Sequence, residues 1–554
     1  MHSPVESREA GLLQSEEPTD YLPREATEDE IETLVHEPQD IPITAWLLSF
    51  TGAGANLARF GITVTWQNYL QNPRGNPLLP GALGLGQATA TTIQSAFLFF
   101  RYLTPIPFAV VSDAYLGRHT TMHISLGLLV AGYIVLIATS IPSALDQGAG
   151  LPGLVVTMIL VGLGQGGLSA VMYPFIADQI PDEKPKVRRN KKGQLVVTER
   201  QLAVQYVFNG YYWMVNVGSL VTIATTLIER HVDFWLAFLL PTVIFVITIF
   251  PAIWWHKRIV KLPPEGNVLP QATKVLLLAS VSGFRLSAAS PETQKSLHGR
   301  DVPWTSAFVS EIRRGLKGCR VIICFVIFWL CYDQSSNNII SQAGQMRPDG
   351  INNDTIQALN SLACIIIAPL IQDLLFPFLR KHKLPFGPIL RMTVGFLFTA
   401  AAIAYAAGIQ HYIYSKGPCY NYPLECDAAL LETDSGKRGP NDVSIWLQTP
   451  LLVLLAFGEI LCLVSLNEYT YSEAPTNLKS MVQALQAVSS AAGAALGIAL
   501  GIASKNPYLV ILFGSMAGAM AFSAALFWIV FRKYDTVYET RKSNLTTEAE
   551  SSSS

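Results

Sequence analysis

About twelve stretches of apolar residues, each long enough to cross a lipid bilayer, dominate this 554-residue chain. A spanning helix needs about 20 predominantly apolar residues. Half of the residues are hydrophobic (50%) and only 14% are charged, whereas soluble domains carry about 25% charged residues. We therefore expect an all-α membrane protein, with spans near residues 43–70, 84–112, 119–142, 152–178, 202–228, 233–255, 320–342, 356–379, 388–412, 444–466, 480–503 and 507–531.

The charges of the connecting loops predict the orientation of the chain. Lys and Arg gather in residues 182–194, in the linker 257–317 and in residues 380–383, while loop 143–151 has none. Basic loops stay in the cytoplasm, and an even number of spans then places both termini there as well. The expected parts are a disordered acidic tail (1–41), a six-helix bundle (42–256), a cytoplasmic linker (257–317), a second six-helix bundle (318–531) and a cytoplasmic tail (532–554).

Several classes of function have no support in the sequence. The net charge of −1 argues against a nucleic-acid partner, and we expect a monomer in the lipid bilayer. The sequence has no phosphate loop, no cluster of metal ligands and no pairing of a nucleophile with a base, so we expect neither an enzyme nor a bound cofactor. Within the linker, Trp304–Lys317 predicts either an amphipathic helix on the membrane or a solvated connector.

The polar loop between the ninth and tenth spans contains Cys419 and Cys426. A disulfide can form there if the loop is extracellular, because that compartment is oxidising. The sequon Asn353-Asp354-Thr355 also falls on the predicted outer side. Asn353 is therefore a candidate for N-glycosylation.

The polar run Trp329–Met346 interrupts the seventh apolar span. Asp333 follows directly on a continuous apolar segment, and Gln334, Asn337 and Asn338 follow it. A carboxylate inside a span costs about 2.5–3.5 kcal/mol on insertion scales unless it faces a partner or an aqueous space. This run therefore predicts a pathway for a solute or an ion.

Two further motifs lie in the first half of the chain. Asp113-Ala-Tyr-Leu-Gly117-Arg118 occupies the turn between the second and third spans and resembles the D-x-x-x-G-R signature of major facilitators. It implies a conformational latch formed by Asp113, Gly117 and Arg118. Phe208–Leu220, which includes Tyr211 and Asn216, resembles the F-Y-x-x-I-N-x-G-S-L signature of the proton-dependent oligopeptide transporters.

The resemblance to these transporters, and especially to their fungal branch, covers roughly residues 45–530. It implies the major facilitator fold, with two six-helix bundles. It also implies that Asp333 takes part in proton coupling, and that Asn360 and Glu459 receive the amino terminus of a peptide. A buried carboxylate beside an amide is a chemically sound receptor for an ammonium group. Asn216 and Tyr211 are the corresponding substrate-binding candidates in the first half.

The chain departs from the family in its first and fourth spans. Aligned without gaps, the family's E-x-x-E-R-F motif falls on Gly52–Leu57, so both glutamates and the arginine are missing and Arg59 stands where a tyrosine is expected. A shifted alignment would make Arg59-Phe60 the R-F pair, but Ala55 and Ala58 would still replace the glutamates. Ser169 replaces the lysine that the family places in span four. We hypothesise that Arg59 acts as the substitute cation, paired with Asp333 or with a substrate carboxylate.

These features together predict a secondary transporter that imports di- or tripeptides by alternating access, with protons as the coupling ion and Asp333 and Glu459 as the coupling acids. Because much of the first-half set is lost, two alternatives stay open. One is a divergent facilitator or exporter of a modified peptide or another amine-bearing metabolite. The other is a nutrient receptor that does not transport. The resemblance favours the plasma membrane over the vacuole.

Overall fold

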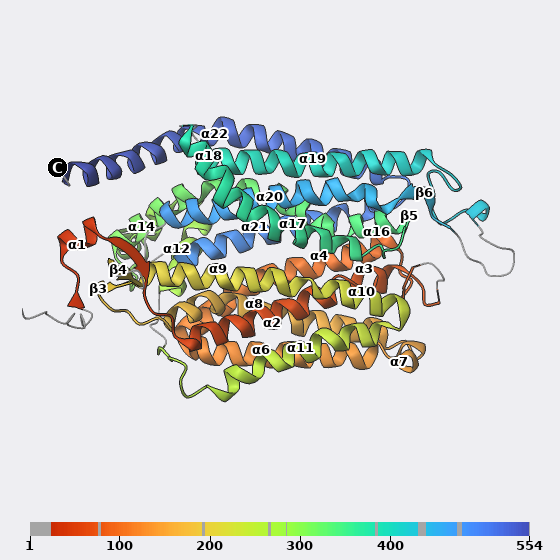
Figure 1. Cartoon of the computed structure of the whole chain (residues 1–554), viewed down its shortest axis with the longest axis horizontal. Helices are drawn as coiled ribbons and strands as arrows, with labels where there is room; N and C mark the ends of the chain where they lie inside the picture. Colours follow the sequence, from red (N-terminus) through yellow and green to blue (C-terminus); the bar gives the residue numbers. More distant parts are fainter. Residues whose placement is uncertain are drawn as a thin grey trace, which may run out of the picture.

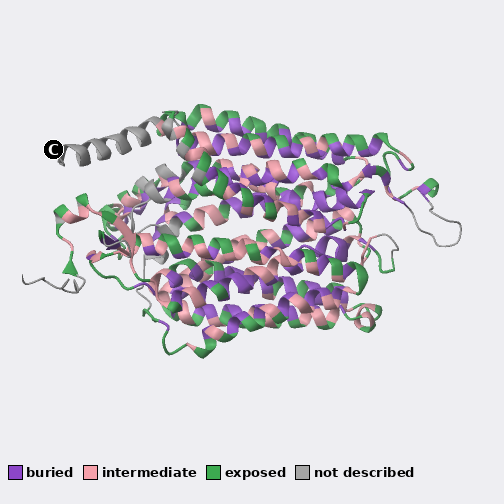
Figure 2. Cartoon of the chain, in the orientation of Figure 1, coloured by how far each residue is buried: buried purple, intermediate pink, exposed green. Residues whose placement is uncertain are grey.

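The molecule is built from long helices that run side by side along one axis (Figure 1). The computed structural model describes residues 24–75, 79–190, 194–263, 268–283, 285–382, 386–429, 439–473 and 479–552. Within these residues, nine helical stretches are long and apolar enough to cross a membrane. The outer faces of the helices carry many exposed side chains (Figure 2), including Ile134, Phe250 and Phe522. Apolar exposure on this scale would be a liability in water but suits contact with lipid.

The nine stretches correspond to a larger number of membrane crossings. Gln87–Thr139 contains 53 residues, which at about 1.5 Å per residue is more than twice the thickness of the hydrocarbon core. Gly117, with φ +75°, breaks this stretch into two spans. The helices near residues 43–71 and 325–344 add two more polar crossings. The twelve crossings predicted from the sequence are therefore accounted for.

The first half of the chain packs around its own hydrophobic core, which includes Leu48, Met122 and Phe238. The pairs α6–α8 and α2–α11 are prominent packing contacts within it. Its helical elements are α2 (Ile43–Thr63), α3 (Trp66–Gln71), α4 (Gln87–Leu103), α5 (Pro105–Val111), η1 (Ser112–Leu116), α6 (Gly117–Thr139), α7 (Pro142–Asp146), α8 (Gly150–Asp178), α9 (Arg200–Ser219), α10 (Val221–His231) and α11 (Phe234–Trp254).

The second half has a separate core, which includes Phe328, Phe396 and Phe527. Its helix α19 packs closely against both α20 and α22. The elements are η3 (Cys319–Cys324), α15 (Phe325–Tyr332), η4 (Asp333–Ser336), α16 (Asn338–Gly344), η5 (Thr355–Gln357), α17 (Ala358–Pro369), η6 (Leu370–Leu375), α18 (Phe376–Lys381), α19 (Pro388–Ser415), η7 (Asp427–Ala429), η8 (Ile445–Gln448), α20 (Thr449–Glu473), α21 (Lys479–Leu500), η10 (Gly501–Ala503) and α22 (Leu509–Ser552).

The two halves meet closely where α4 of the first half packs against α21 and η10 of the second. Glycines make this approach possible. A Cβ atom added at Gly501 would clash with Oγ1 of Thr92, and one at Gly497 would lie 3.1 Å from Oγ of Ser95. Small residues let membrane helices approach each other in this way. The contact fixes how the two halves face one another.

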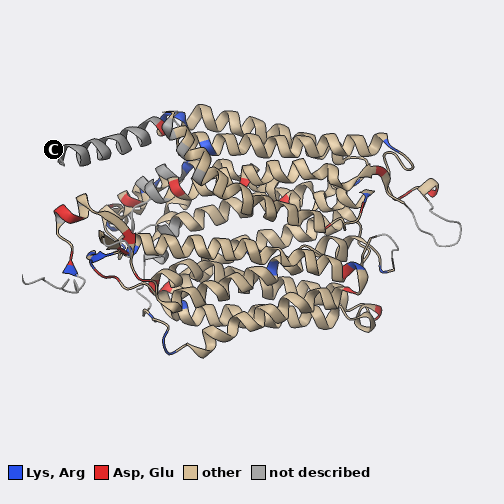
Figure 3. Cartoon of the chain, viewed as in Figure 1, with Lys and Arg blue, Asp and Glu red and all other residues tan. Residues whose placement is uncertain are grey.

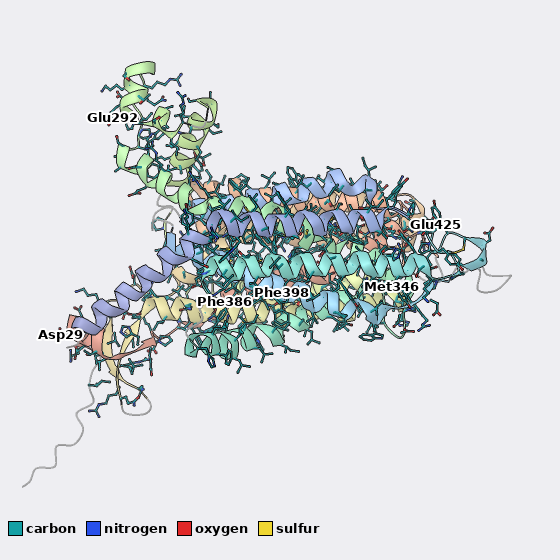
Figure 4. All side chains as sticks on the ribbon, turned by 90° about the horizontal axis from the view of Figure 1, so that it is seen from above. Asp29, Glu292, Met346, Phe386, Phe398 and Glu425 are labelled. Atoms are coloured by element: carbon teal, nitrogen blue, oxygen red, sulfur yellow. A yellow bond between two sulfur atoms is a disulfide. The ribbon has the colours of Figure 1, made fainter. Side chains whose placement is uncertain are left out.

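The two ends of the bundle differ. At one end lie Asp29 and the helices around Glu292, and Glu425 lies at the opposite end (Figure 4). We call these the linker end, which carries the segment between α11 and α15, and the disulfide end, which carries the loop after α19. Charged residues concentrate at both ends of the bundle and are sparse along the helices between them (Figure 3).

The predicted disordered tail 1–41 is wrong for the residues that the structure describes. Residues 24–38 form β1 (Arg24–Glu25), α1 (Glu28–Thr33) and β2 (Val35–Pro38), which join β3 (Lys186–Arg189) and β4 (Leu195–Glu199) in a sheet of order β1-β3-β4-β2. β2 runs parallel to β4, and the other pairs are antiparallel. Acidic residues of the tail bind basic ones of the loop: Lys184 Nζ lies 3.1 Å from Glu25, and Arg188 Nη1 lies 2.7 Å from Asp40.

Two other segments also hold more structure than a connector. The linker forms α12 (Val268–Val281), η2 (Leu286–Ala289), α13 (Pro291–His298) and α14 (Ser306–Gly318). The apolar face of α14, including Val309 and Ile312, packs with Ala272 and Val275 of α12. Of the two alternatives for Trp304–Lys317, the amphipathic helix is therefore favoured over the solvated connector. Its apolar face packs against α12, however, where the sequence predicted contact with the membrane. At the other end of the chain, α22 continues through the predicted tail as far as Ser552.

Candidate functional site

Glu459 lies in α20, facing α15 and α17 of the same half. Nδ2 of Asn360 donates to its Oε2 at 3.2 Å, and Sγ of Cys364 approaches the same oxygen at 3.6 Å. The hydroxyl of Tyr332 also hydrogen-bonds this carboxyl. Oδ1 of Asn360 is buried and has no partner within the described structure. The structure thus brings Glu459 and Asn360 together, as the sequence predicted, and leaves an acceptor beside the carboxyl.

In the first half of the chain, Tyr212 of α9 interacts electrostatically with Glu459. The predicted candidate, its neighbour Tyr211, is instead 5% exposed and accepts a hydrogen bond from Nδ2 of Asn56 at 3.2 Å. Successive residues of a helix point to different faces, so Tyr211 lies against α2 and not against Glu459. Its hydroxyl interacts electrostatically with Arg59, and its assignment to substrate binding stays a prediction. Asn216 lies one turn after Tyr212 and donates to its carbonyl oxygen at 2.9 Å, so it remains a candidate on that face.

Asp333 begins η4, where the seventh span changes from α-helix to 3₁₀-helix. It is 8% exposed, and Oη of Tyr102 donates to its Oδ1 at 3.1 Å. Its Oδ2 has no partner within the described structure. Tyr102 belongs to α4, so this hydrogen bond joins the two halves. The guanidinium of Arg101, over the ring of Tyr102 at 4.4 Å, interacts electrostatically with Asp333.

Arg59 does not make the predicted pair with Asp333. Its Nη2 lies 3.4 Å from Oδ1 of Asn56, and its guanidinium lies 3.8 Å from the ring centre of Phe60. Among the described residues no ion pair joins Arg59 to a carboxylate. Its electrostatic neighbours include Arg101 and, from the second half, Tyr332. The Arg59–Asp333 pair is therefore a wrong prediction, and Arg101 is the cation that lies near Asp333.

Sequence reasoning missed Arg101 and Tyr102, although a signal was present. Arg101 is a single charge inside the apolar run Ala96–Phe108, and a charged residue within a span indicates a functional position by default. The resulting site is polarised. Two guanidinium groups, of Arg59 and Arg101, lie in the first half, and the carboxyl of Glu459 lies in the second.

The latch motif lies at the linker end of α6. Gly117 adopts φ +75°, which favours glycine. Nη1 of Arg118 donates to both carboxylate oxygens of Asp178 at 2.6 Å, while its Nε lies 3.9 Å from Oδ1 of Asp113. Both contacts stay within the first half. In this conformation these contacts brace the first half.

At the disulfide end, the structure joins Cys419 and Cys426 in a disulfide. Asn353 is only 4% exposed, and its Nδ2 donates to Oδ1 of Asn68 at 2.7 Å. A glycan needs that nitrogen to be accessible, so the structure contradicts the prediction of glycosylation at Asn353. The same contact joins α3 of the first half to the segment before η5 in the second.

This contact belongs to a larger set of polar contacts that closes the disulfide end between the halves, which we call the polar seam. Oγ1 of Thr226 lies 2.7 Å from Oγ1 of Thr355, and Nη1 of Arg230 donates to Oδ1 of Asn352 at 2.5 Å. Asn68 also donates to Oε1 of Glu229 at 2.9 Å. The seam consists of Asn68, Thr226, Glu229, Arg230, Asn352, Asn353, Asp354 and Thr355.

Two helical halves, with polar and charged groups facing each other between them, define a secondary transporter of the major facilitator type. Solved structures share this fold. A crystal structure of an auto-inhibited POT family peptide transporter aligns with a TM-score of 0.68 and 20% identity, over 89% of this chain and 97% of that one. The POT family transporter PepTSo aligns with a TM-score of 0.69 and 19% identity, over 90% of this chain and 99% of that one.

The sequence comparisons are more specific. The model of the POT family matches residues 119–510. Peptide transporter PTR_B of Candidozyma auris is 36% identical over 96% of this chain and 89% of its own length. Peptide transporter PTR2 of Saccharomyces cerevisiae is 34% identical over 93% of this chain and 83% of its own length. The chain belongs to the POT family, the proton-dependent oligopeptide transporters.

Proposed function

We propose that this protein is a secondary active transporter of di- and tripeptides that works by alternating access and is driven inward by protons. The observation that carries the proposal is the polarised site, with Glu459 and Asn360 in one half and two arginines in the other. A peptide is a zwitterion, with an ammonium group at one end and a carboxylate at the other. Charge-assisted hydrogen bonds to both ends would hold it across the two halves.

The relatives support this substrate class. The Candidozyma auris and Saccharomyces cerevisiae proteins are peptide transporters by name. One solved POT family transporter is in complex with a thioalcohol-conjugated peptide and another with alafosfalin. For this chain the ammonium end of the peptide would bind Glu459 and Oδ1 of Asn360, which has no partner within the described structure.

The carboxylate end would bind the arginines. Arg59 has no carboxylate partner among the described residues, and Arg101 lies beside it. Two positive charges close together inside the membrane-spanning region repel each other, which is unfavourable unless an anion lies between them. A substrate carboxylate would be such an anion. The arginines would then make the carboxylate contact that the family's span-four lysine makes and that Ser169 cannot make here. The retained cations favour a peptide with a free carboxyl terminus over an amine that lacks one.

We further propose that Asp333 and Glu459 exchange the coupling protons. Asp333 hydrogen-bonds Tyr102 across the interface of the two halves, so its protonation state affects a contact that must change when the halves move. We also propose that the linker end faces the cytoplasm and that the protein works as a monomer in the plasma membrane. The basic linker supports this orientation, and the disulfide at the opposite end fits an oxidising exterior.

The test is uptake of a dipeptide by liposomes that contain the purified protein, with and without an inward proton gradient. Accumulation above the outside concentration, dependent on the gradient, is the expected result. Entry that only equilibrates would replace the proposal with a facilitator. Absence of entry from folded protein that still binds the peptide would indicate a receptor.

A further inference from the structure

Glu229 and Asp354 bring two acidic side chains into contact across the polar seam. Glu229 comes from the end of α10 in the first half, and Asp354 directly precedes η5 in the second. Glu229 is 4% exposed and Asp354 is 0% exposed. Their carboxyl groups lie close enough to share a hydrogen bond if one of them carries a proton. The contact is therefore a buried carboxyl pair shared by the two halves.

Such a pair needs a proton. Ionised carboxylates only accept hydrogen bonds, so one of the two groups must be protonated for the contact to form. Two buried negative charges in contact would repel each other strongly. Oε2 of Glu229 and both carboxylate oxygens of Asp354 are buried without a hydrogen-bond donor in the described structure. The backbone N–H groups of Asp354 and Thr355 lie near enough to favour the ionised form of Asp354, which leaves Glu229 as the group that carries the shared proton.

The surroundings compensate only part of the charge of the pair. Asn68 of α3 donates to Oε1 of Glu229 at 2.9 Å, which leaves the second oxygen for Asp354. The guanidinium of Arg230 acts electrostatically on Asp354 and also donates to the neutral amide of Asn352. One positive charge offsets one of the two carboxylates and leaves the other to be neutralised by a proton. His231 and Asp233 follow Arg230 in the chain and are further titratable or charged groups at this end of α10.

The seam must open if the disulfide end is to admit a substrate. We propose that Glu229 and Asp354 form a proton-binding site between the two halves, which takes one proton from the solution at the disulfide end when the seam closes and returns it there when the seam opens. On opening, the O–H bond of the protonated carboxyl breaks and the proton passes to water, leaving two hydrated carboxylates. On closing, one carboxylate regains a proton.

This proton differs from those that drive transport, because it enters and leaves on the same side. It makes the outer pH a regulator of the closed seam. The inference rests on the proposed function only in requiring that the disulfide end opens and closes. Burial raises the pKa of Asp354 above its usual range. The closed seam is therefore favoured at acidic pH, and the advantage is lost as the pH rises through the raised pKa of the pair, by at most about tenfold per pH unit.

The experiment measures the seam directly and needs no substrate. Nitroxide labels are attached at the exposed residues Gln147 and Ser415, on opposite halves of the disulfide end, in a background without free cysteines. Distances between the labels are recorded by pulsed electron spin resonance from about pH 4 to about pH 8, a range that brackets ordinary and raised carboxyl pKa values. The fraction with the short distance is expected to fall as the pH rises.

Three variants make the test decisive. In Glu229→Gln and, separately, Asp354→Asn, an amide donates in place of the shared proton, so the short-distance fraction should no longer depend on pH. Asp442→Asn removes an exposed acid at the same end, paired with Arg347, and should keep the parent's dependence. A parent without pH dependence would overturn the proposal, and so would amide variants that titrate like the parent. Neither outcome depends on whether the protein transports peptides.

Discussion

At the residue scale, Glu459 is set up to bind a cation. Its carboxyl receives hydrogen bonds from neutral groups of Asn360 and Tyr332, not an ion pair from a neighbouring Lys or Arg within the described structure. A carboxylate held in this way keeps its charge available to a ligand, whereas a paired one would not. The same helix offers a comparison, because Glu468 is paired with Arg391 at 2.8 Å.

Replacing Glu459 with Gln should abolish peptide uptake. The change keeps the shape of the side chain but removes the charge that meets the ammonium group, and a hydrogen bond to a charged group contributes about 1.5–3 kcal/mol, or roughly ten- to 150-fold in affinity. Uptake by whole cells at matched surface expression measures the effect. Glu468→Gln is the control and should stay within about twofold of the parent, since partly exposed ion pairs contribute little. Equal losses in both variants would contradict this role for Glu459.

Replacing Asp333 with Asn should separate coupling from binding. The amide can still accept from Tyr102, so the contact between the halves survives, but it cannot exchange a proton in the working pH range. We expect gradient-driven accumulation to be lost, while exchange of labelled for unlabelled peptide continues. Proteoliposome assays with equal peptide on both sides measure the exchange. Accumulation at the parent's level would show that Asp333 is not a coupling acid.

The candidate site was partly predictable. A lone acid in an apolar span is unfavourable without a function, so Asp333 and Glu459 could be selected from composition alone. The partner of Asp333 could not be predicted in this way, because Tyr102 lies 231 positions away in the sequence. The rotation of α9 about its axis, which the motif does not specify, places Tyr212 near Glu459 and Tyr211 near Asn56 and Arg59.

At the scale of elements, close helix packing depends on a few small residues. Gly54 of α2 faces α11, and a Cβ atom there would clash with Oγ1 of Thr248. The hydroxyl of Thr51 also donates to the carbonyl oxygen of Thr248 at 2.9 Å. The span pattern predicts both helices but not this contact.

The same limit applies to the tail sheet. Its strands β1 and β2 are too short to show a pattern, and they pair with strands far along the chain.

Replacing Gly54 with Ala should destabilise the first half by about 1–3 kcal/mol, because the added methyl group overpacks this interface. Combining it with Thr248→Ala should recover part of the loss, since the second change removes the clashing atom. Thermal unfolding in detergent measures both. Gly127→Ala in α6 is the matched control and should be neutral or slightly stabilising, because a Cβ atom there meets no atom within 4 Å. A Gly54→Ala variant as stable as the parent would contradict the close packing of α2 against α11.

At the scale of the whole molecule, two halves with separate cores meet through polar groups and through the α4–α21 packing. The count of spans and the loop charges predicted this division. The closed disulfide end could not be predicted, because the polar seam is built from single side chains on α3, on α10, in the segment before η5 and at the first residue of η5. The division of charge between the two halves is the central feature of the molecule, because it favours a substrate that carries both an ammonium group and a carboxylate.

Binding of capped and uncapped dipeptides to the purified protein tests this feature most directly. We expect a free dipeptide to bind at least about tenfold more tightly than its N-acetylated or C-amidated form, as the loss of a charge-assisted contact implies. The penalty for acetylation should disappear in Glu459→Gln, and that for amidation in Arg59→Gln combined with Arg101→Gln. Equal binding of the free and capped peptides by the parent protein would contradict the account.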